Sequence, residues 1–348
     1  MQANIDTCSQ LIRQAAAAGA TLVCTPENTA RMTALTQKTA AVAAPADPAS
    51  AAAPAASSFS SVAAASAPAS SPPPFSTHPV LTALSALASE LNIFILVGSI
   101  AVRPEQAETE AAAAQAAGQM EDKRVCNRSV LLAPRPRLPA ASSSSFSSAP
   151  AASAPSSLSQ VVACYDKIHL FDVPALNGAE SYLESARIRP GDCAPVVAIP
   201  DLLSPLPSSS SPSPSPSLCV QLGMTICYDL RFPALFRSLA QAGANVIVVP
   251  SAFTVVTGRA HWHALLRARA IETGAYIVAP AQVGVHPGSR TTYGHSLIVD
   301  PWGTVMADAG GDHPGIIVAD IDLATVQEVR RKIPSLTHDR PFTIHKVQ

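Results

Sequence analysis

Cys227 stands where an apolar run ends and polar residues begin, in the stretch Gly223-Met-Thr-Ile-Cys-Tyr-Asp-Leu-Arg-Phe-Pro233. The run before it, residues 219–226, is short and rich in apolar side chains, which predicts a largely buried strand. Pro233 suits the first turn of a helix, because proline lacks the N–H that would be unpaired there. Cys227 is therefore expected at the carboxyl end of a strand, where α/β sheets bind ligands and an enzyme could present a nucleophilic thiol.

Two other ionisable residues also follow predicted strands. Glu27 comes after residues 21–25 and a proline, and Lys167 comes after residues 161–165. Each of the three residues alone has a simpler explanation. A buried cysteine such as Cys227 often only fills core volume, and a glutamate after a strand is usually a solvated loop residue. A thiol that attacks an amide or nitrile carbon, however, needs a base, a donor for the developing oxyanion and an acid for the departing nitrogen. The combination therefore indicates covalent hydrolysis.

The elements that would position these residues alternate between helix and strand. Helical spacing of apolar residues predicts helices over residues 5–16, 234–243 and 261–272, and apolar runs predict strands at 21–25, 245–249 and 275–279. In the last third, strands at 295–299 and 304–306 are joined by turn residues 300–303, and a strand at 315–321 precedes a polar helix near 325–332. These patterns predict a layered α/β fold with mixed sheets and helices outside two packed sheets.

Alanine, serine and proline dominate much of the rest of the chain. The 48% hydrophobic content of the 348 residues is inflated by alanine, and the runs near residues 39–74, 104–120, 134–160 and 204–217 have few large apolar groups. Such segments cannot offset an ordering cost of about 1–2 kcal/mol per residue. We therefore interpret them as disordered insertions. What remains, roughly 240 residues, suits one α/β domain.

Charge and cysteine content limit the partners. The formal net charge is −1 and there is no basic stripe, which argues against nucleic acid, and no apolar run approaches membrane-spanning length. The seven cysteines are odd in number and scattered, which favours free thiols in a reducing compartment. No hydrophobic signal core stands in the first residues. We expect a cytoplasmic protein, with the mitochondrion as the alternative location.

Several other features have structural explanations. His261 and His263 could suggest a metal site, but residues two apart on a helix point to different sides, so no metal is predicted. His295 falls in the predicted strand 295–299 and is interpreted as a hydrogen-bonded core histidine. Asn127-Arg-Ser129 matches a glycosylation pattern, yet it leads into the apolar run 130–133, so we expect a strand there and no glycan.

Blocks around the candidate residues resemble the signatures of the nitrilase, or carbon–nitrogen hydrolase, family. These blocks are Pro26-Glu27-Asn28, Tyr165-Asp-Lys-Ile-His-Leu-Phe-Asp172, Leu183-Glu-Ser185 and Ile226-Cys-Tyr-Asp-Leu-Arg-Phe-Pro233, and the likeness continues through residues 250–253, 265–272 and 293–305. It covers nearly everything outside the low-complexity runs. The resemblance implies a single domain over residues 1–348 with an αββα sandwich fold, paired into a homodimer.

The resemblance also implies roles for particular residues. Glu27 would be the general base, Cys227 the nucleophile that forms a thioester, and Lys167 the oxyanion stabiliser together with the backbone N–H of Tyr228. Glu184 resembles a second glutamate that several family members place near the lysine and the substrate. No metal or organic cofactor is implied.

The substrate is expected to be a small-molecule amide. A substrate carboxylate would need a donor, and Arg231 is one candidate, although a structural ion pair explains it equally well. Ser251 and Phe253, in the matching block 250–253, are the other candidates for substrate contacts.

The residues around Cys227 narrow the reaction. True nitrilases carry Trp-Glu after the nucleophile, whereas Tyr228-Asp229 resembles the amidase branch called Nit. Residues 281–284 and 290–296 are most similar to those of deaminated glutathione amidases, and we expect hydrolysis of such an amide with release of ammonia. Omega-amidase activity on 2-oxoglutaramate is the close alternative. A catalytically inactive Nit-like interaction protein is the third.

The sequence departs from the family pattern in places. Related sequences usually have Glu where this chain has His263 and Ala234. They also generally have a strand before the first helix, whereas residue 1 of this chain directly precedes that helix. Without such an inner strand we expect unpaired backbone and an apolar gap.

Overall fold

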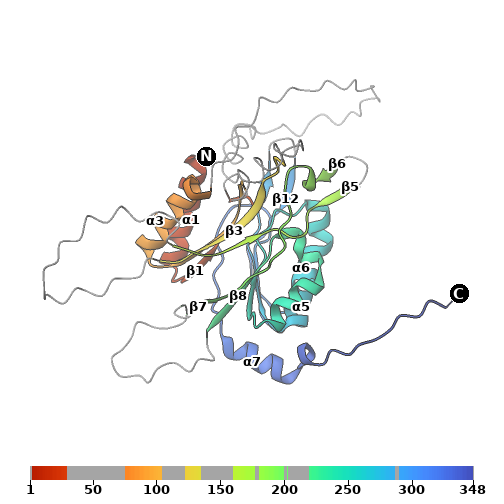
Figure 1. Cartoon of the computed structure of the whole chain (residues 1–348). Coiled ribbons are helices and arrows are strands. Elements are labelled where there is room, and N and C mark those ends of the chain that lie inside the picture. The colour runs from red at the N-terminus through yellow and green to blue at the C-terminus, as the bar shows by residue number, and fades with distance from the viewer. Residues whose placement is uncertain are drawn as a thin grey trace, which may run out of the picture.

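The computed structural model describes residues 2–29, 75–103, 122–134, 160–176, 180–199, 202, 219–286 and 290–347. The low-complexity runs near residues 39–74, 104–120, 134–160 and 204–217 lie outside the described residues, apart from residues 134 and 160 at the ends of one run. The described part contains two main β-sheets with helices on their outer sides (Figure 1).

The first sheet has four strands in the order β1-β2-β3-β4. Their bounds are β1 (Leu22–Cys24), β2 (Phe94–Val102), β3 (Cys126–Leu132) and β4 (Val161–Asp166). β1 runs parallel to β2, and the other neighbours are antiparallel.

The second sheet has six strands in the order β14-β13-β10-β9-β8-β7. Their bounds are β7 (Val196–Ile199), β8 (Val220–Met224), β9 (Val246–Val248), β10 (Tyr276–Ala279), β13 (Leu297–Val299) and β14 (Val305–Asp308). β8, β9 and β10 are parallel, and antiparallel strands flank them. The mixed sheet predicted from the sequence is therefore confirmed.

Helices cover the outer faces of both sheets. α1 (Gln2–Ala17) and α3 (Pro79–Leu91) lie against the first sheet, and α5 (Pro233–Gln241) and α6 (Val255–Thr273) lie against the second (Figure 1). Alternate residues of β2 face opposite layers, since Ile95 packs with the α1 and α3 side chains whereas Leu96 packs with the second sheet. The predicted αββα sandwich is confirmed.

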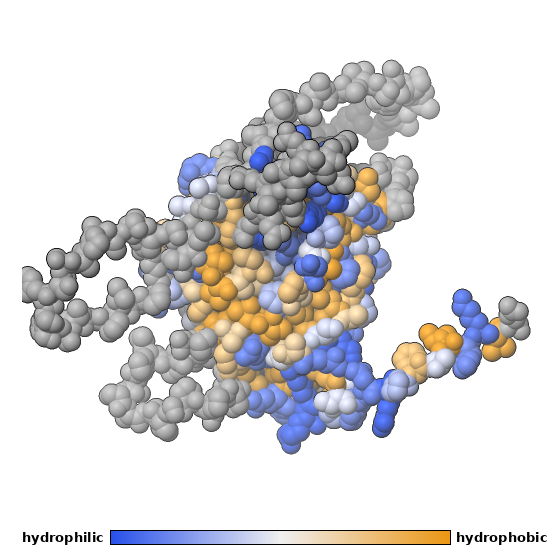
Figure 2. All heavy atoms as spheres, viewed as in Figure 1, coloured by the Kyte–Doolittle hydropathy of each residue, from blue (hydrophilic) through white to orange (hydrophobic). Residues whose placement is uncertain are grey.

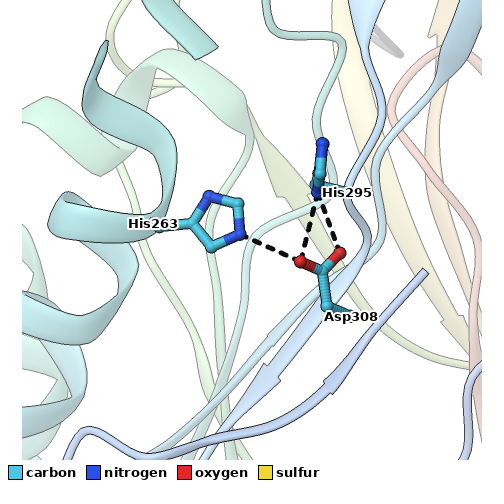
Figure 3. A group of neighbouring side chains, drawn as sticks. All are labelled: His263, His295 and Asp308. Atoms are coloured by element: carbon cyan, nitrogen blue, oxygen red, sulfur yellow. Dashed lines mark hydrogen bonds and ion pairs between the residues drawn. The ribbon is translucent and has the colours of Figure 1, made fainter. Parts of the chain in front are cut away.

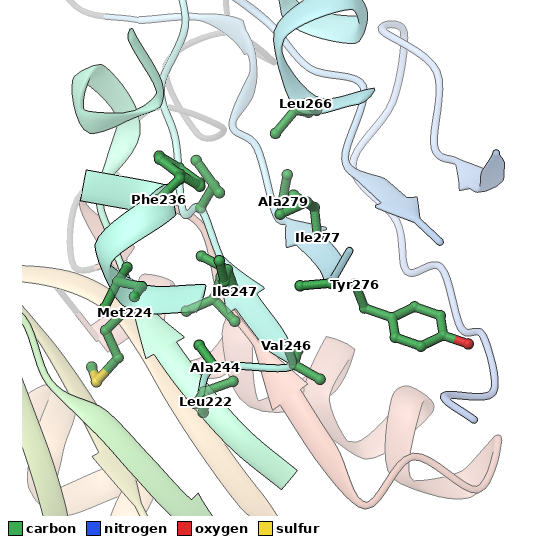
Figure 4. Close-up of a cluster of buried hydrophobic side chains, with 14 of the residues drawn as sticks. Leu222, Met224, Phe236, Ala244, Val246, Ile247, Leu266, Tyr276, Ile277 and Ala279 are labelled. Carbon is green, nitrogen blue, oxygen red and sulfur yellow. The ribbon is translucent and has the colours of Figure 1, made fainter. Parts of the chain in front are cut away.

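The core of the second sheet explains why its strands read as continuous apolar runs. Both faces are covered, so successive residues such as Val246 and Ile247 are each buried (Figure 4). Phe236 of α5 and Leu266 of α6 pack in the same cluster. The short helix α7 (Leu323–Lys332), predicted near residues 325–332, adds buried side chains at its first turn.

Shorter elements connect the layers. They are the strand pairs β5 (Asp172–Leu176) with β6 (Glu180–Leu183) and β11 (Val283–Val285) with β12 (Thr291–Tyr293), and the 3-10 helices η2 (Phe75–Thr77), η4 (Glu184–Ala186), η5 (Cys227–Arg231) and η6 (Ser335–Thr337). The predicted hairpin between β13 and β14 is confirmed, with the Gly303 N–H donating to the Asp300 carbonyl.

The sequence-based assignment was wrong for two segments. Residues 315–321 form no strand, because no strand in the described residues pairs with them. His295 lies before β13 rather than in it, and its side chain is 24% exposed. Positive φ values at Gly294 and His295, 73° and 55°, turn the chain away from the sheet there. His295 is therefore not a core histidine.

An apolar groove runs along the outer edge of β1. It encloses a volume of about 560 Å³ between α1, β1, the second sheet and residues 312–321, and Leu11, Val23 and Ile317 are among the side chains that line it. Figure 2 shows hydrophobic residues across the middle of the molecule, between the α1/α3 layer and the α5/α6 layer. Among the described strands β1 pairs with β2 alone, so its other edge borders this groove.

The helices and the cysteines bear on the expected surroundings of the protein. Within the described ranges, no helix is both long and apolar enough to cross a bilayer. All seven cysteines are free thiols, as their scattered positions predicted.

α6 begins at Val255, earlier than residue 261 where the sequence pattern placed its start. Thr254 caps it by accepting a hydrogen bond from the Thr257 N–H. The first turn contains Gly258, a residue that usually weakens helices, but a Cβ at this position would overlap the ring of Tyr293. Glycine thus allows β12 to lie close against α6.

We predict that Gly258→Ala lowers the free energy of unfolding by about 1–3 kcal/mol, because the added methyl group overpacks the contact with Tyr293. Urea unfolding followed by circular dichroism measures this. Gly315→Ala, where an added Cβ meets nothing within 4 Å, is the control and should change little. A gain of stability of about 1 kcal/mol in Gly258→Ala, as in an exposed helix, would contradict the prediction.

Candidate active site

Lys167 is a buried cation held by two carboxylates. Its side chain is 2% exposed, and its Nζ lies 3.1 Å from Glu27 Oε1 and 2.9 Å from Glu184 Oε2. Lys167 follows β4, Glu27 follows β1, and Glu184 opens η4 after β6. A buried charge needs paired partners, so the ends of these strands must converge here. The structure brings together these three residues that the sequence singled out.

The ion pairs keep both Lys167 and Glu27 charged. Burial favours the neutral amine, but the negative charges of Glu27 and Glu184 and a hydrogen bond to Glu184 outweigh it and raise the pKa of Lys167. Burial also favours the protonated form of Glu27, yet the charge of Lys167 and hydrogen bonds from Cys227 and Lys167 hold the pKa of Glu27 below its usual value. Glu27 is therefore a carboxylate at neutral pH.

Cys227 joins this group from the second sheet. It follows β8 as the first residue of η5, its φ is 49°, and its N–H donates to the Pro250 carbonyl at 2.9 Å. Its thiol is hydrogen-bonded to Glu27. Burial and the negative charge of Glu27 raise the pKa of Cys227, although Lys167 and a hydrogen bond from the Ala252 backbone act in the opposite direction. The resting group is thus a neutral thiol beside a carboxylate that can accept its proton.

Asp229 fixes the chain around Cys227. This fully buried carboxylate accepts hydrogen bonds from the Tyr165 hydroxyl at 2.7 Å, the His169 N–H at 3.0 Å and the Ile226 N–H at 2.8 Å. Tyr165 and His169 belong to β4 and the segment after it, whereas Ile226 precedes Cys227. Asp229 therefore ties the end of β8 to the segment that carries Lys167.

Asn127 is a site residue that sequence reasoning assigned to no chemistry. It lies in β3, is 5% exposed, and its Nδ2 is 3.0 Å from Glu27 Oε1 and 3.4 Å from Glu184 Oε1. The glycosylation pattern is therefore buried in a strand, as expected. The signal that could have identified Asn127 is an amide shortly before the apolar run 130–133, within one strand.

Gln282 lies in residues 281–284, to which the sequence assigned no catalytic role. Its Nε2 donates hydrogen bonds to the backbone carbonyls of Glu27 and Asn28, the second at 3.3 Å. Asn28 has a positive φ of 58°, and its N–H donates to Ser99 Oγ at 2.8 Å. These contacts fix the turn that aims Glu27 at Lys167.

The predicted substrate contacts lie close to Cys227 but have other partners. The guanidinium of Arg231 stacks 5.4 Å from the centroid of the Phe253 ring, and Phe253 itself is buried 4.8 Å from the Trp262 ring. The hydroxyl of Ser251 is buried and donates to the Val249 carbonyl at 2.9 Å. The ring of Tyr228, directly after Cys227, packs edge to face against that of Phe171, with the ring centroids 5.0 Å apart.

Arg290 is a second cation near the carboxylate, and sequence reasoning did not single it out. Its positive charge helps to lower the pKa of Glu27, and it donates to the Ala252 carbonyl at 2.8 Å. Its buried Nε has no hydrogen-bond partner among the residues that the structure describes. A buried donor without an acceptor is uncommon in proteins, which makes this atom a candidate contact for a ligand.

Comparison with known proteins supports one family. The family model described as carbon-nitrogen hydrolase matches residues 1–331. Proteins named deaminated glutathione amidase from Synechocystis and from human are 44% and 45% identical over 179 and 181 residues, 51% and 52% of this chain. The chain spans 59% and 50% of the lengths of these relatives.

Solved structures agree on the fold. The C. elegans NitFhit protein superimposes with a TM-score of 0.60 at 25% identity, covering 97% of this chain and 61% of that one. Saccharomyces cerevisiae Nit3, a member of branch 10 of the nitrilase superfamily, gives a TM-score of 0.51 at 26% identity, covering 75% and 71%.

We predict that Lys167→Met lowers the free energy of unfolding at neutral pH by about 3–5 kcal/mol, because two carboxylates would stay buried without their cation. Chemical denaturation measures the change. The control is Lys332→Met, since the Lys332–Glu328 pair is exposed and should contribute little. Equal effects of the two substitutions would show that the buried ion pairs do not hold this site together.

Proposed function

Because this chain belongs to the carbon–nitrogen hydrolase family, we propose that it hydrolyses a non-peptide amide through a thioester on Cys227. The observation that carries the proposal is the contact between the Cys227 thiol and the Glu27 carboxylate, which is itself paired with buried Lys167. A thiol, a base and a cation in contact are what acyl transfer to sulfur requires.

The first half of the proposed reaction forms the thioester. Glu27 takes the proton from the Cys227 sulfur, and the sulfur attacks the amide carbon. The carbonyl oxygen becomes an oxyanion, which the Lys167 ammonium and the Tyr228 N–H stabilise. When this intermediate collapses, the carbon–nitrogen bond breaks and the nitrogen receives the proton that Glu27 carries. An amine or ammonia leaves, and the acyl group stays on sulfur.

The second half releases the acid. Glu27 takes a proton from water as the water oxygen attacks the thioester carbon, and Lys167 again faces the oxyanion. Collapse breaks the carbon–sulfur bond and returns the proton to sulfur, so the resting thiol is restored. Glu184 acts in both halves by holding Lys167, with two contacts of 2.9 and 3.1 Å to its Nζ.

The proposed substrate is deaminated glutathione, the compound in the printed names of the relatives from Synechocystis and human. Its scissile nitrogen belongs to the cysteine residue, so hydrolysis yields 2-oxoglutarate and cysteinylglycine. Ammonia, the product expected from the sequence, would come only from the primary amide of 2-oxoglutaramate. Both compounds carry a carboxylate beside a ketone. Arg290, with its buried Nε unpartnered among the described residues, is our candidate to bind that carboxylate.

The proposal extends to the state of the protein. A single domain over residues 1–348 is supported by the family match, which runs across the low-complexity segments.

A homodimer is supported by exposed apolar side chains that share one surface hollow, Ile271 of α6 with Trp302 and Ile333. A net charge of −1 supports a small-molecule partner over nucleic acid, and free cysteines support a reducing compartment, the cytoplasm or the mitochondrion.

We expect the protein to convert deaminated glutathione to 2-oxoglutarate and cysteinylglycine, and Cys227→Ala to lose at least roughly a thousandfold in rate because the nucleophile is gone. Chromatographic detection of the dipeptide measures this, with 2-oxoglutaramate as the second substrate. Cys193→Ala, which removes an exposed thiol, is the matched control and should retain activity. Full activity in Cys227→Ala would refute the covalent route. An inactive but folded wild-type protein would favour an interaction role.

For Arg290 we predict a substrate-dependent defect. Arg290→Gln should raise the KM for 2-oxoglutaramate by roughly 10–100-fold, because a hydrogen bond to a charged group strengthens binding by about this factor. The KM for a neutral 2-oxo amide should not change. Arg231→Gln, the competing candidate from the sequence, should raise neither KM. Steady-state kinetics on the two amides separates them. Equal losses on both amides in Arg290→Gln would instead assign this residue to positioning Ala252 and Glu27.

A further inference from the structure

Three metal-ligating side chains meet on the side of the second sheet that α6 covers. They are His263 from α6, His295 from the connection before β13, and Asp308 at the end of β14 (Figure 3). The His263 Nε2 lies 3.0 Å from Asp308 Oδ2, and the His295 Nδ1 lies 3.0 and 3.1 Å from the two Asp308 oxygens. One ligand atom from each residue can be chosen so that all lie within 4.8 Å of one another.

The surrounding backbone fixes this cluster. His295 keeps a left-handed φ of 55°, its N–H donates to the Gly310 carbonyl at 2.8 Å, and its carbonyl accepts from the Trp262 indole at 2.7 Å. Asp308 Oδ1 accepts the Gly310 N–H at 2.9 Å. Trp262 is fully buried and precedes His263, so it also sets the position of that histidine on α6. The side chains are thus held together before any ligand binds.

The spacing and donor types suit a transition metal. Zinc takes imidazole nitrogens and carboxylate oxygens at about 2.0–2.2 Å, so ligand atoms around a tetrahedral ion lie about 3.3 Å apart. The nitrogen–oxygen distances of 3.0 and 3.1 Å are close to this separation. Two nitrogen donors disfavour magnesium and calcium, which prefer oxygen ligands.

The cluster is also reachable from solvent. The side chains of His263, His295 and Asp308 are 36%, 24% and 33% exposed, which gives an ion a route in and leaves a coordination position for water. The objection from the sequence, that His261 and His263 point to different sides of one helix, does not apply. The second histidine comes from a distant segment, while His261 lies 3.4 Å from Arg231.

We propose that His263, His295 and Asp308 form a binding site for a divalent transition metal, with zinc as the first choice and one position open to water. The site is separate from Glu27, Lys167 and Cys227, and it does not depend on the proposed amidase activity. A bound ion would tie α6 to β14 and to the connection before β13.

Titration of the metal-free full-length chain with cobalt(II), followed by visible absorption, tests the proposal. We expect one cobalt ion per chain, with the d–d bands of a nitrogen and oxygen site and without the near-ultraviolet charge-transfer band of a thiolate site. His263→Gln and Asp308→Asn each change a ligand, so each should weaken cobalt binding by at least roughly 10–100-fold, the loss that follows when a residue that only supports a ligand is changed. His261→Gln, two residues away on α6, is the matched control and should bind as the wild type does.

Zinc-dependent thermal unfolding supplies a second measurement in which each variant is its own reference. The wild type and His261→Gln should gain melting temperature as zinc is added, and His263→Gln and Asp308→Asn should gain none relative to their own metal-free forms. Absence of stoichiometric binding by the wild type would overturn the proposal. So would unchanged binding in both cluster variants, or a thiolate spectrum, which would assign the ion to a cysteine.

Discussion

The burial of one ammonium group between two carboxylates is the constraint on which the rest of the site depends. Lys167 is charged and nearly inaccessible, so Glu27 and Glu184 must both reach it. Glu27 and Lys167 lie 140 residues apart in the chain and follow opposite edge strands of the first sheet, β1 and β4. The sheet must therefore be complete before the charges can be paired. Asp229 then extends the same constraint to the second sheet, because its hydrogen bonds place Cys227 beside this charged group.

The sequence alone was enough to single out the candidate residues that stand at the ends of strands. Glu27, Lys167 and Cys227 each come at most one residue after a predicted strand, so local pattern alone places them at the edge of a sheet. Asn127, Gln282 and Arg290 could not be recognised in this way, because their importance comes from partners far away in the chain. Only the folded sheet places the Asn127 amide between two glutamates.

Errors in the predicted elements have a similar cause. Residues 315–321 have a strand-like composition, but a strand also needs a neighbour to pair with, which composition does not contain. His295 lies beside an apolar run, and the turn that removes it from the sheet depends on two consecutive positive φ values. α6 begins at Val255 rather than at residue 261, and Gly258 in its first turn fits there because of its close contact with Tyr293. Tertiary contacts outweighed local propensity at each of these places.

Backbone strain limits how this protein can vary over evolutionary time. The non-glycine residues with positive φ in the described ranges are Asn28, Asn92, Cys227 and His295. Cys227 is the candidate nucleophile, Asn28 follows Glu27, and His295 belongs to the histidine cluster. A left-handed residue costs about 1–2 kcal/mol, and most of all when its side chain is β-branched. At Cys227 this excludes threonine on steric grounds and leaves serine as the hydroxyl replacement that the backbone tolerates. Glycine would relieve the strain at this position, but it would also remove the thiol. No single substitution can therefore relax the backbone here and keep the nucleophile.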